Sequence, residues 1–478
     1  MTTADGTVLD TTQVVSSGSP NNRWNLVLMS DGYRSTELAQ YHQHVRDFIG
    51  ALRATPPFDT HWGAINIYRV DVTSTDSGTD DPVNCADDPP GTTGSGASPR
   101  TYFDSTVCGF GTRRLLTVNT ATAQTVALAE VPQYTRAMVM VNTTLYGGSG
   151  GNPVGVFSTG YTPAVEAHGV AIHELGHTAF GLADEYGGCT PGQPNRYTGP
   201  EPEEPNVTTI TDRATTKWRH RIAATTALPT QSIANCTVCG VPASPVPAGT
   251  VGLFEDAYYA HCGIYRPEYN CKMREAERPF CAVCTAAIID LLDDFSAPEP
   301  TTPMTVVDAD SIKVARMYNP SGSVVVQDTS PPLALTGLIG SGFVQCRRLP
   351  RGLPGAGAAG LFGYEYRISL VGPSEVGPAV GVNRLELDIG TVTPLNYAGT
   401  GPADFYILTS GAIGTVRPSS VERTAAGRLV LTFNPAVLTS QSSFFMGFAS
   451  TNPVQDTPIR VVDGAGRMYD LEGKGPAL

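Results

Sequence analysis

The residues best suited to chemistry are two histidines and a glutamate in the pattern His-Glu-x-x-His. They are His173, Glu174 and His177. Because positions i and i+4 share one face of a helix, the two imidazoles can bind one metal ion. Glu174, beside the first ligand, can reach a water on that metal. Two histidines, a further protein ligand and an open position form the pattern of a catalytic zinc site, so we expect one zinc ion here.

The third ligand must come from a chain that reverses direction after the helix. Gly181, four residues past His177, permits this because glycine readily adopts a left-handed conformation. Asp184 and Glu185 follow, and we favour Asp184 as the ligand with Glu185 as the alternative. The competing interpretation is an amphipathic helix with two ordinary histidines, which the surrounding glycine and acidic residues disfavour.

The elements that must position these residues alternate between strands and helices along the first part of the chain. Runs of β-branched and apolar residues indicate strands, and apolar residues at helical spacing indicate helices. The expected strands are 24–29, 65–72, 137–142 and 154–158, and the expected helices are 38–52, 120–130, 163–180 and 281–295. This order predicts an α/β (α+β) domain over residues 1–296.

The composition changes after Phe295. Residues 297–303 are rich in proline and predict a linker. Beyond them, short β-like runs are separated by glycine and proline, which is typical of a β-sandwich or jelly-roll. We therefore expect an all-β accessory domain over residues 304–478, with a binding or spacer role.

Overall composition excludes several classes of protein. Of 478 residues, 51 are glycine and 38 proline, and only 16% are charged, which excludes a coiled coil and wholesale disorder. The net charge of −13 argues against a nucleic-acid partner. The sequence contains no apolar run long enough to span a membrane.

Ten cysteines, an even number concentrated in loop-like sequence, predict disulfides and an oxidising compartment. Cys85 and Cys108 are a plausible pair within one long loop. Cys236-x-x-Cys239 with Cys281-x-x-Cys284 has the spacing of a zinc ribbon, but we favour disulfides for these four as well. The first residues show neither the basic nor the apolar part of a signal peptide. That leaves an intracellular protein or a mature secreted one, and the cysteines favour secretion.

The run from His173 to Tyr186 resembles the signature of the immunoglobulin A peptidase (M64) family of metallopeptidases. Further resemblances lie in residues 25–33, 71–82 and 265–284, so that together they cover about residues 22–295. The resemblance implies a metzincin-like zinc peptidase domain, in which a Met-turn lies beneath the metal. Met273 is the residue that would carry this role. Without the resemblance, it could equally well be a methionine that only fills space in the hydrophobic core.

The resemblance also implies an activity, which is zinc-dependent endopeptidase hydrolysis of protein or peptide substrates. Glu174 would act as general base, and Tyr265 or Tyr269 could donate a hydrogen bond to the transition state. An extended substrate could add as a strand along residues 138–158. Two alternatives stay open: an extracellular adhesin with a degenerate, metal-binding peptidase domain, and a hydrolase of non-peptide amides. A cluster of aspartates could hold Ca²⁺, although a solvated loop is the simpler interpretation. These aspartates are Asp76, Asp80 and Asp81.

Overall fold

The computed structural model describes residues 5–89, 91–151, 153–296, 299–322, 326–375, 381–410, 414–425 and 427–477. The chain divides into two compact units. The first comprises Met1–Thr12 and Arg23–Ala297, and the second Gln13–Asn22 and Pro298–Leu478. Residues 13–22, which we expected in the first domain, therefore lie in the second unit. None of the helices described is both long and apolar enough to cross a membrane.

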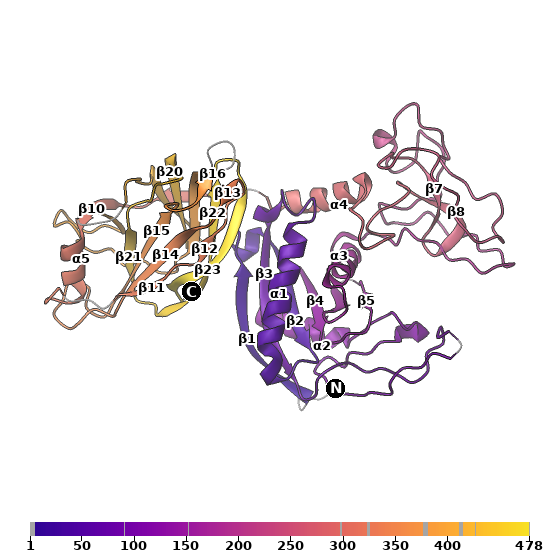
Figure 1. The fold of residues 1–478 in the computed structure, drawn as a ribbon, viewed down its shortest axis with the longest axis horizontal. Helices are drawn as coiled ribbons and strands as arrows, with labels where there is room; N and C mark the ends of the chain where they lie inside the picture. Colours follow the sequence, from indigo (N-terminus) through magenta and orange to yellow (C-terminus); the bar gives the residue numbers. More distant parts are fainter. Residues whose placement is uncertain are drawn as a thin grey trace. The chain divides into compact units, whose positions relative to one another are not determined.

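A mixed sheet forms the centre of the first unit (Figure 1). Within the described residues its strand order is β1-β3-β2-β4-β6-β5, and all the pairings among β2, β3, β4 and β6 are parallel. Strand β5 is antiparallel to β6 and lies at the edge. The bounds are Gly6–Val15 (β1), Trp24–Asp31 (β2), Ile65–Ser74 (β3), Arg136–Val141 (β4), Gly148–Ser149 (β5) and Val154–Ser158 (β6).

Helices cover both faces of this sheet, which explains why every residue of β2 is buried. Val27 and Met29 pack in one cluster with Val126 of α2. Trp24, on the opposite face of β2, stacks on Phe180 of α3, with ring centroids 5.8 Å apart. The helices are α1 (Leu38–Arg53), α2 (Thr120–Glu130), α3 (Ala164–Phe180) and α4 (Ala282–Asp293), and all four match the sequence prediction closely.

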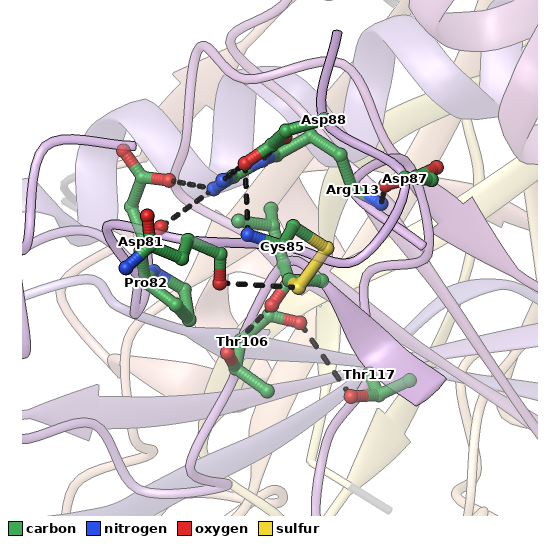
Figure 2. The surroundings of a disulfide bond; sticks show 11 residues. Asp81, Pro82, Cys85, Asp87, Asp88, Thr106, Arg113 and Thr117 are labelled. Atoms are coloured by element: carbon green, nitrogen blue, oxygen red, sulfur yellow. Dashed lines mark hydrogen bonds and ion pairs between the residues drawn. A yellow bond between two sulfur atoms is a disulfide. The ribbon is translucent and has the colours of Figure 1, made fainter. Parts of the chain in front are cut away.

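The long loop after β3 is held by a disulfide between Cys85 and Cys108, as predicted (Figure 2). Arg113 crosses this loop and its guanidinium binds Asp81 at 2.8 Å as well as Asp88. Two further disulfides among the described residues close the loops between α3 and α4. They join Cys189 to Cys239 and Cys236 to Cys262, around the hairpin β7 (Phe254–Ala257) and β8 (Ala260–Arg266).

The second unit is rich in strands. In the part that the structure describes, β13 pairs with β16 alone, and the other strands form two larger sheets. One has the order β10-β18-β21-β15-β14-β11, with β12 also paired to β14, and the other has the order β23-β22-β17-β20-β19-β9. Side chains of both sheets, such as Tyr366 and Leu385, form one buried cluster. The bounds are Thr301–Pro303 (β9), Val306–Asp310 (β10), Gln327–Thr329 (β11), Pro332–Leu333 (β12), Leu338–Ile339 (β13), Gly342–Leu349 (β14), Phe362–Ser369 (β15), Ser374–Glu375 (β16), Gly381–Asp388 (β17), Phe405–Ser410 (β18), Ser420–Thr424 (β19), Arg428–Leu438 (β20), Met446–Ser450 (β21), Val454–Asp463 (β22) and Met468–Pro476 (β23).

Two features of the second unit differ from the sequence prediction. Thr301–Pro303, expected in the linker 297–303, form β9 and pair with β19, whereas residues 297 and 298 lie outside the described residues. A short helix, α5 (Ser311–Tyr318), interrupts the strands. The Asp310 side chain caps it by accepting hydrogen bonds from the backbone N–H groups of Ile312 and Lys313.

Candidate metal centre

The His-Glu-x-x-His motif lies in the last turns of α3. The helix ends at Gly181, whose φ of 60° and ψ of 31° place it in the left-handed region. The chain then turns back, and Leu182 N–H donates to the carbonyl oxygen of Gly176 at 3.2 Å. This turn, predicted from the glycine, returns Asp184 to the face of α3 that carries the two histidines.

Three ligand atoms converge at this point. The Nε2 atoms of His173 and His177 are 3.1 Å apart, and Asp184 Oδ1 lies 3.1 Å from the first and 3.2 Å from the second. Tetrahedral zinc with bonds of about 2.0–2.1 Å would separate its ligand atoms by about 3.3 Å. The observed triangle therefore has the size that one zinc ion requires.

The other nitrogen of each imidazole sets its tautomer. His173 Nδ1 lies 2.9 Å from the carbonyl oxygen of Lys272, and His177 Nδ1 lies 2.6 Å from that of Leu182. A carbonyl oxygen only accepts hydrogen bonds, so each neutral ring holds its proton on Nδ1. When both rings are neutral, their Nε2 lone pairs face each other and Asp184, an arrangement that suits a shared cation. When a ring is protonated, its Nε2–H donates to Asp184 instead.

The carboxylates of the centre are buried, and their surroundings differ. Burial alone would raise the pKa of Asp184, but hydrogen bonds to His173 and His177 outweigh it and hold that pKa well below its ordinary value. Glu174 is buried, and its burial raises its pKa, with the two histidines opposing the rise. Asp184 is therefore the ionised carboxylate of the cluster, while Glu174 is the more basic of the two.

Edge strand β5 packs tightly against the same face of α3. A Cβ added to Gly148 would lie 2.8 Å from Glu174 Oε1, and one added to Gly150 would lie 2.4 Å from the Cβ of His177. The outer side of β5 is partly covered, since Gly148 N–H donates to Arg114 O and Leu116 N–H donates to Gly148 O. A substrate strand could not pair with Gly148 while these bonds persist, so the hypothesis of strand addition does not hold at this residue.

Met273 lies beside the motif helix. It is fully buried, and its sulfur would be 2.7 Å from a Cβ on Gly176. Its carbonyl oxygen accepts a hydrogen bond from Glu185 N–H at 2.7 Å, and the preceding Lys272 carbonyl holds His173. The position proposed from the resemblance is therefore next to the metal centre.

The two consecutive acidic residues point to different places. Asp184 joins the histidines, whereas Glu185 Oε1 accepts from Asn206 Nδ2 at 2.9 Å and lies 3.2 Å from Cys284 Sγ. The geometry thus favours Asp184 over Glu185 as third ligand. It also leaves Glu185 in a separate cluster with cysteines.

The tyrosine next to the centre is Tyr259 rather than Tyr265 or Tyr269. The Tyr259 hydroxyl donates to Asp184 Oδ2, and its ring packs edge-on against Tyr186, which in turn accepts a hydrogen bond from Arg114. Tyr265 belongs to β8, where its backbone pairs with that of Thr208. Tyr269 donates through its hydroxyl to Pro242 O. No periodicity in the sequence marks Tyr259, which lies 75 residues beyond Asp184.

Two other metal hypotheses are affected by the structure. Asp76 pairs with Arg100 at 2.9 Å and Asp81 with Arg113, so two of the three carboxylates of the expected calcium site, all but Asp80, already have cationic partners. The zinc ribbon is wrong because Cys236 and Cys239 are in disulfides with other cysteines. Our preference for disulfides at Cys281 and Cys284 was also wrong, as both are free.

Comparison with known proteins finds a family model that matches most of the first unit. The profile described as IgA Peptidase M64 matches residues 12–235 and 243–292, more than half of the chain. The chain belongs to the IgA peptidase M64 family. The matched region of this M64 peptidase contains the whole centre built above, from His173 to Met273, and ends within α4. No curated protein matches the chain.

Proposed function

We propose that this M64 peptidase is a zinc-dependent endopeptidase and that His173, His177 and Asp184 bind its catalytic zinc. The convergence of their three ligand atoms within 3.2 Å carries the proposal. Zinc, when bound, supplies a Lewis acid for the attacking water and the scissile carbonyl. We extend the proposal to a metzincin-like arrangement, in which Met273 forms the floor of the centre.

Glu174 is the general base in this proposal. Its carboxylate interacts electrostatically with His173, His177 and Asp184, which supports a place beside the centre. It takes a proton from the attacking water and delivers it to the leaving amine. Burial raises the pKa of Glu174, and a more basic carboxylate is better matched to this task at neutral pH.

Tyr259 acts on the centre through Asp184. Its hydroxyl donates to Oδ2, leaving Oδ1 directed at both histidines. Just over half of the Tyr259 side chain is exposed, 55%, so it lies at the surface of the centre rather than in the core. We assign it as a positioning residue for Asp184, a role distinct from the transition-state donor expected of Tyr265 or Tyr269.

Hydrolysis of a protein substrate tests the proposal. Glu174→Gln should abolish the digestion of casein or gelatin while the catalytic zinc stays bound, whereas His177→Ala should lose both the digestion and the catalytic zinc. A chelator should inactivate the wild-type protein, and added zinc should restore it. Measurable proteolysis by pure Glu174→Gln protein would contradict the assignment of the base. An adhesin with a degenerate domain would bind zinc but cleave nothing, and a hydrolase of other amides would release products only from non-peptide substrates.

Secretion and an accessory role for the second unit belong to the same proposal. Three disulfides among the described cysteines favour an oxidising compartment. The two larger sheets of the second unit share one core, as in a β-sandwich or jelly-roll. The second unit lies outside nearly all of the M64 match, which is consistent with a role in binding or spacing rather than catalysis.

A further inference from the structure

A second cluster of metal-ligand side chains lies in the interior of the first unit. It consists of Cys271, Cys281, Cys284 and Glu185, all of them buried. One potential ligand atom from each lies within 4.8 Å of all the others. The three cysteines form no disulfide. The peptidase mechanism above uses none of the four residues.

We propose that these four residues bind a second, structural zinc ion. Tetrahedral zinc with Zn–S bonds of about 2.3 Å separates two sulfurs by about 3.8 Å, and a sulfur from a carboxylate oxygen by about 3.5 Å. Cys271 Sγ and Cys284 Sγ are 3.7 Å apart. Glu185 Oε1 lies 3.2 Å from Cys284 Sγ and 3.7 Å from Cys281 Sγ. Four protein ligands with no open position are typical of structural zinc.

The surroundings of Glu185 support a cation at this cluster independently of the distances. It is fully buried, yet its Oε2 has no hydrogen-bond partner among the described residues. Leaving a buried carboxylate oxygen without a partner is costly, and a cation in the cluster would remove that cost. Asn206 donates to Oε1 and orients the carboxylate, as residues around metal ligands commonly do.

Backbone N–H groups contact two of the three sulfurs, where they would stabilise the thiolates that bind zinc. Cys281 is the N-cap of α4, and its sulfur accepts from Cys284 N–H at 3.4 Å. Cys271 Sγ accepts from Cys281 N–H at 3.2 Å. N–H groups at the start of a helix stabilise negative charge, so the N-terminus of α4 complements a cluster of bound thiolates.

A disulfide is the main competing state, and the geometry disfavours it. The 3.7 Å between Cys271 Sγ and Cys284 Sγ greatly exceeds the bond length of about 2.05 Å. A disulfide between any two of the three sulfurs would also leave the third thiol buried beside the Glu185 carboxylate. Zinc uses all four groups at once.

The position of the cluster gives this zinc a role. Glu185 directly follows Asp184, and Cys271 lies two residues before Met273. One ion would therefore hold the two segments that supply the third catalytic ligand and the residue beneath α3. Helix α4 would be tied to both segments through Cys281 and Cys284. The structural zinc does not itself depend on peptidase activity.

Elemental analysis of the full-length protein tests the site. We expect two zinc ions per chain in the wild type and one in His173→Ala/His177→Ala. In that variant, zinc X-ray absorption should show sulfur neighbours at about 2.3 Å. Cys281→Ser/Cys284→Ser should lose this zinc, while the control Cys346→Ser, which alters a buried free cysteine of the second unit, should keep both. A zinc-free His173→Ala/His177→Ala protein that remains folded would overturn the proposal.

Counting thiols in the wild type keeps the test decisive even if the double serine variant does not fold. Alkylation in denaturant with a chelator and no reductant should modify four cysteines per chain, namely Cys271, Cys281, Cys284 and Cys346. Two modified cysteines would reveal a disulfide within the cluster and would contradict the site. Failure of the proposed peptidase function would show instead as no proteolysis by the wild-type protein, with the zinc count unchanged.

Discussion

The sulfur of Met273 lies against Gly176, in the middle of the His-Glu-x-x-His motif, so closely that a Cβ on the glycine would be 2.7 Å from it. Contacts shorter than 3.0 Å are not tolerated without displacement of one partner. Both the helix and Met273 are buried, so neither can move freely. Because residue 176 is a glycine, helix α3 and the segment that carries Met273 can approach each other this closely.

Gly176→Ala should therefore destabilise the protein and impair the metal centre, because it forces α3 away from Met273. We expect a loss of roughly 1–3 kcal/mol in the free energy of unfolding, as for other overpacked cores. Gly50→Ala is the matched control: Gly50 is an exposed residue of α1, and its Cβ would meet nothing within 4 Å. Gly50→Ala should raise the free energy of unfolding by about 0.5–1 kcal/mol. Urea denaturation compares the two, and equal effects would contradict the close contact.

Tyr259→Phe should lower kcat more than it raises KM, since the hydroxyl positions Asp184. Loss of one such hydrogen bond should reduce kcat/KM by about 10–100-fold, as for other residues that orient metal ligands. The neighbouring Tyr258 offers a control, because its hydroxyl bonds to Glu204 at 3.0 Å instead. Steady-state kinetics on one peptide substrate should show Tyr258→Phe close to wild type. Similar losses in both variants would indicate a general structural effect.

Removal of Arg428 should strongly destabilise the second unit. Its buried guanidinium lies 3.1 Å from Glu386 Oε2 and 3.2 Å from Asp388 Oδ1. Arg428→Met leaves Asp388 without this cation and Glu386 with Arg384 alone, which should cost roughly 3–5 kcal/mol in the free energy of unfolding.

The matched control for this change is an exposed ion pair in the same unit. Arg417 lies 2.8 Å from Asp308, with about half of each side chain exposed. Arg417→Met should cost no more than about 1 kcal/mol. Denaturation followed by circular dichroism measures both variants, and a loss at Arg428 as small as that at Arg417 would contradict the buried network.

Glu365 should give the stability of the second unit a defined pH dependence. Burial raises the pKa of this carboxyl, against opposing effects of Arg347 and Tyr406. Between the ordinary value of 4.5 and the raised one, the folded state keeps a proton that the unfolded state has lost. This contribution to the free energy of unfolding therefore falls as pH rises through that window.

Glu365→Gln removes the titrating group and keeps an acceptor for the Tyr406 hydroxyl, which lies 2.9 Å away. The wild-type free energy of unfolding, relative to that of the variant, should thus decrease from about pH 4 to pH 7. Urea denaturation at a series of pH values checks the slope. A difference that grows with pH would show that burial does not govern this group.

Much of the metal centre could be predicted because it is local in the chain. His173 and His177 share one helix face with Glu174 next to the first, and the left-handed Gly181 returns the chain within a few residues. The strands and helices of the first unit could likewise be predicted, the strands from apolar runs and the helices from apolar residues at helical spacing. Helix α5 was missed, although its capping residue Asp310 is a recognisable start signal.

The remaining features depend on residues that are distant in sequence. Whether Cys281 pairs with Cys284, with another cysteine or with a metal follows from where Cys271 and Glu185 lie, and spacing alone does not encode that. Tyr259 reaches Asp184 across 75 residues, through a β7–β8 connection that carries no periodic signal. The pairing of Gly148 with residues 114–116 likewise arises only when two loops meet.

The sequence by itself determined the M64 family, the motif helix and the turn that returns Asp184, because helix periodicity and glycine conformation act over a few residues. Only the tertiary structure decided that Asp184 joins the histidines while Glu185 turns to the cysteines, and that Tyr259 rather than Tyr265 contacts the centre. The physical reason is that side-chain direction after a turn is set by packing against distant segments, which local propensities do not specify.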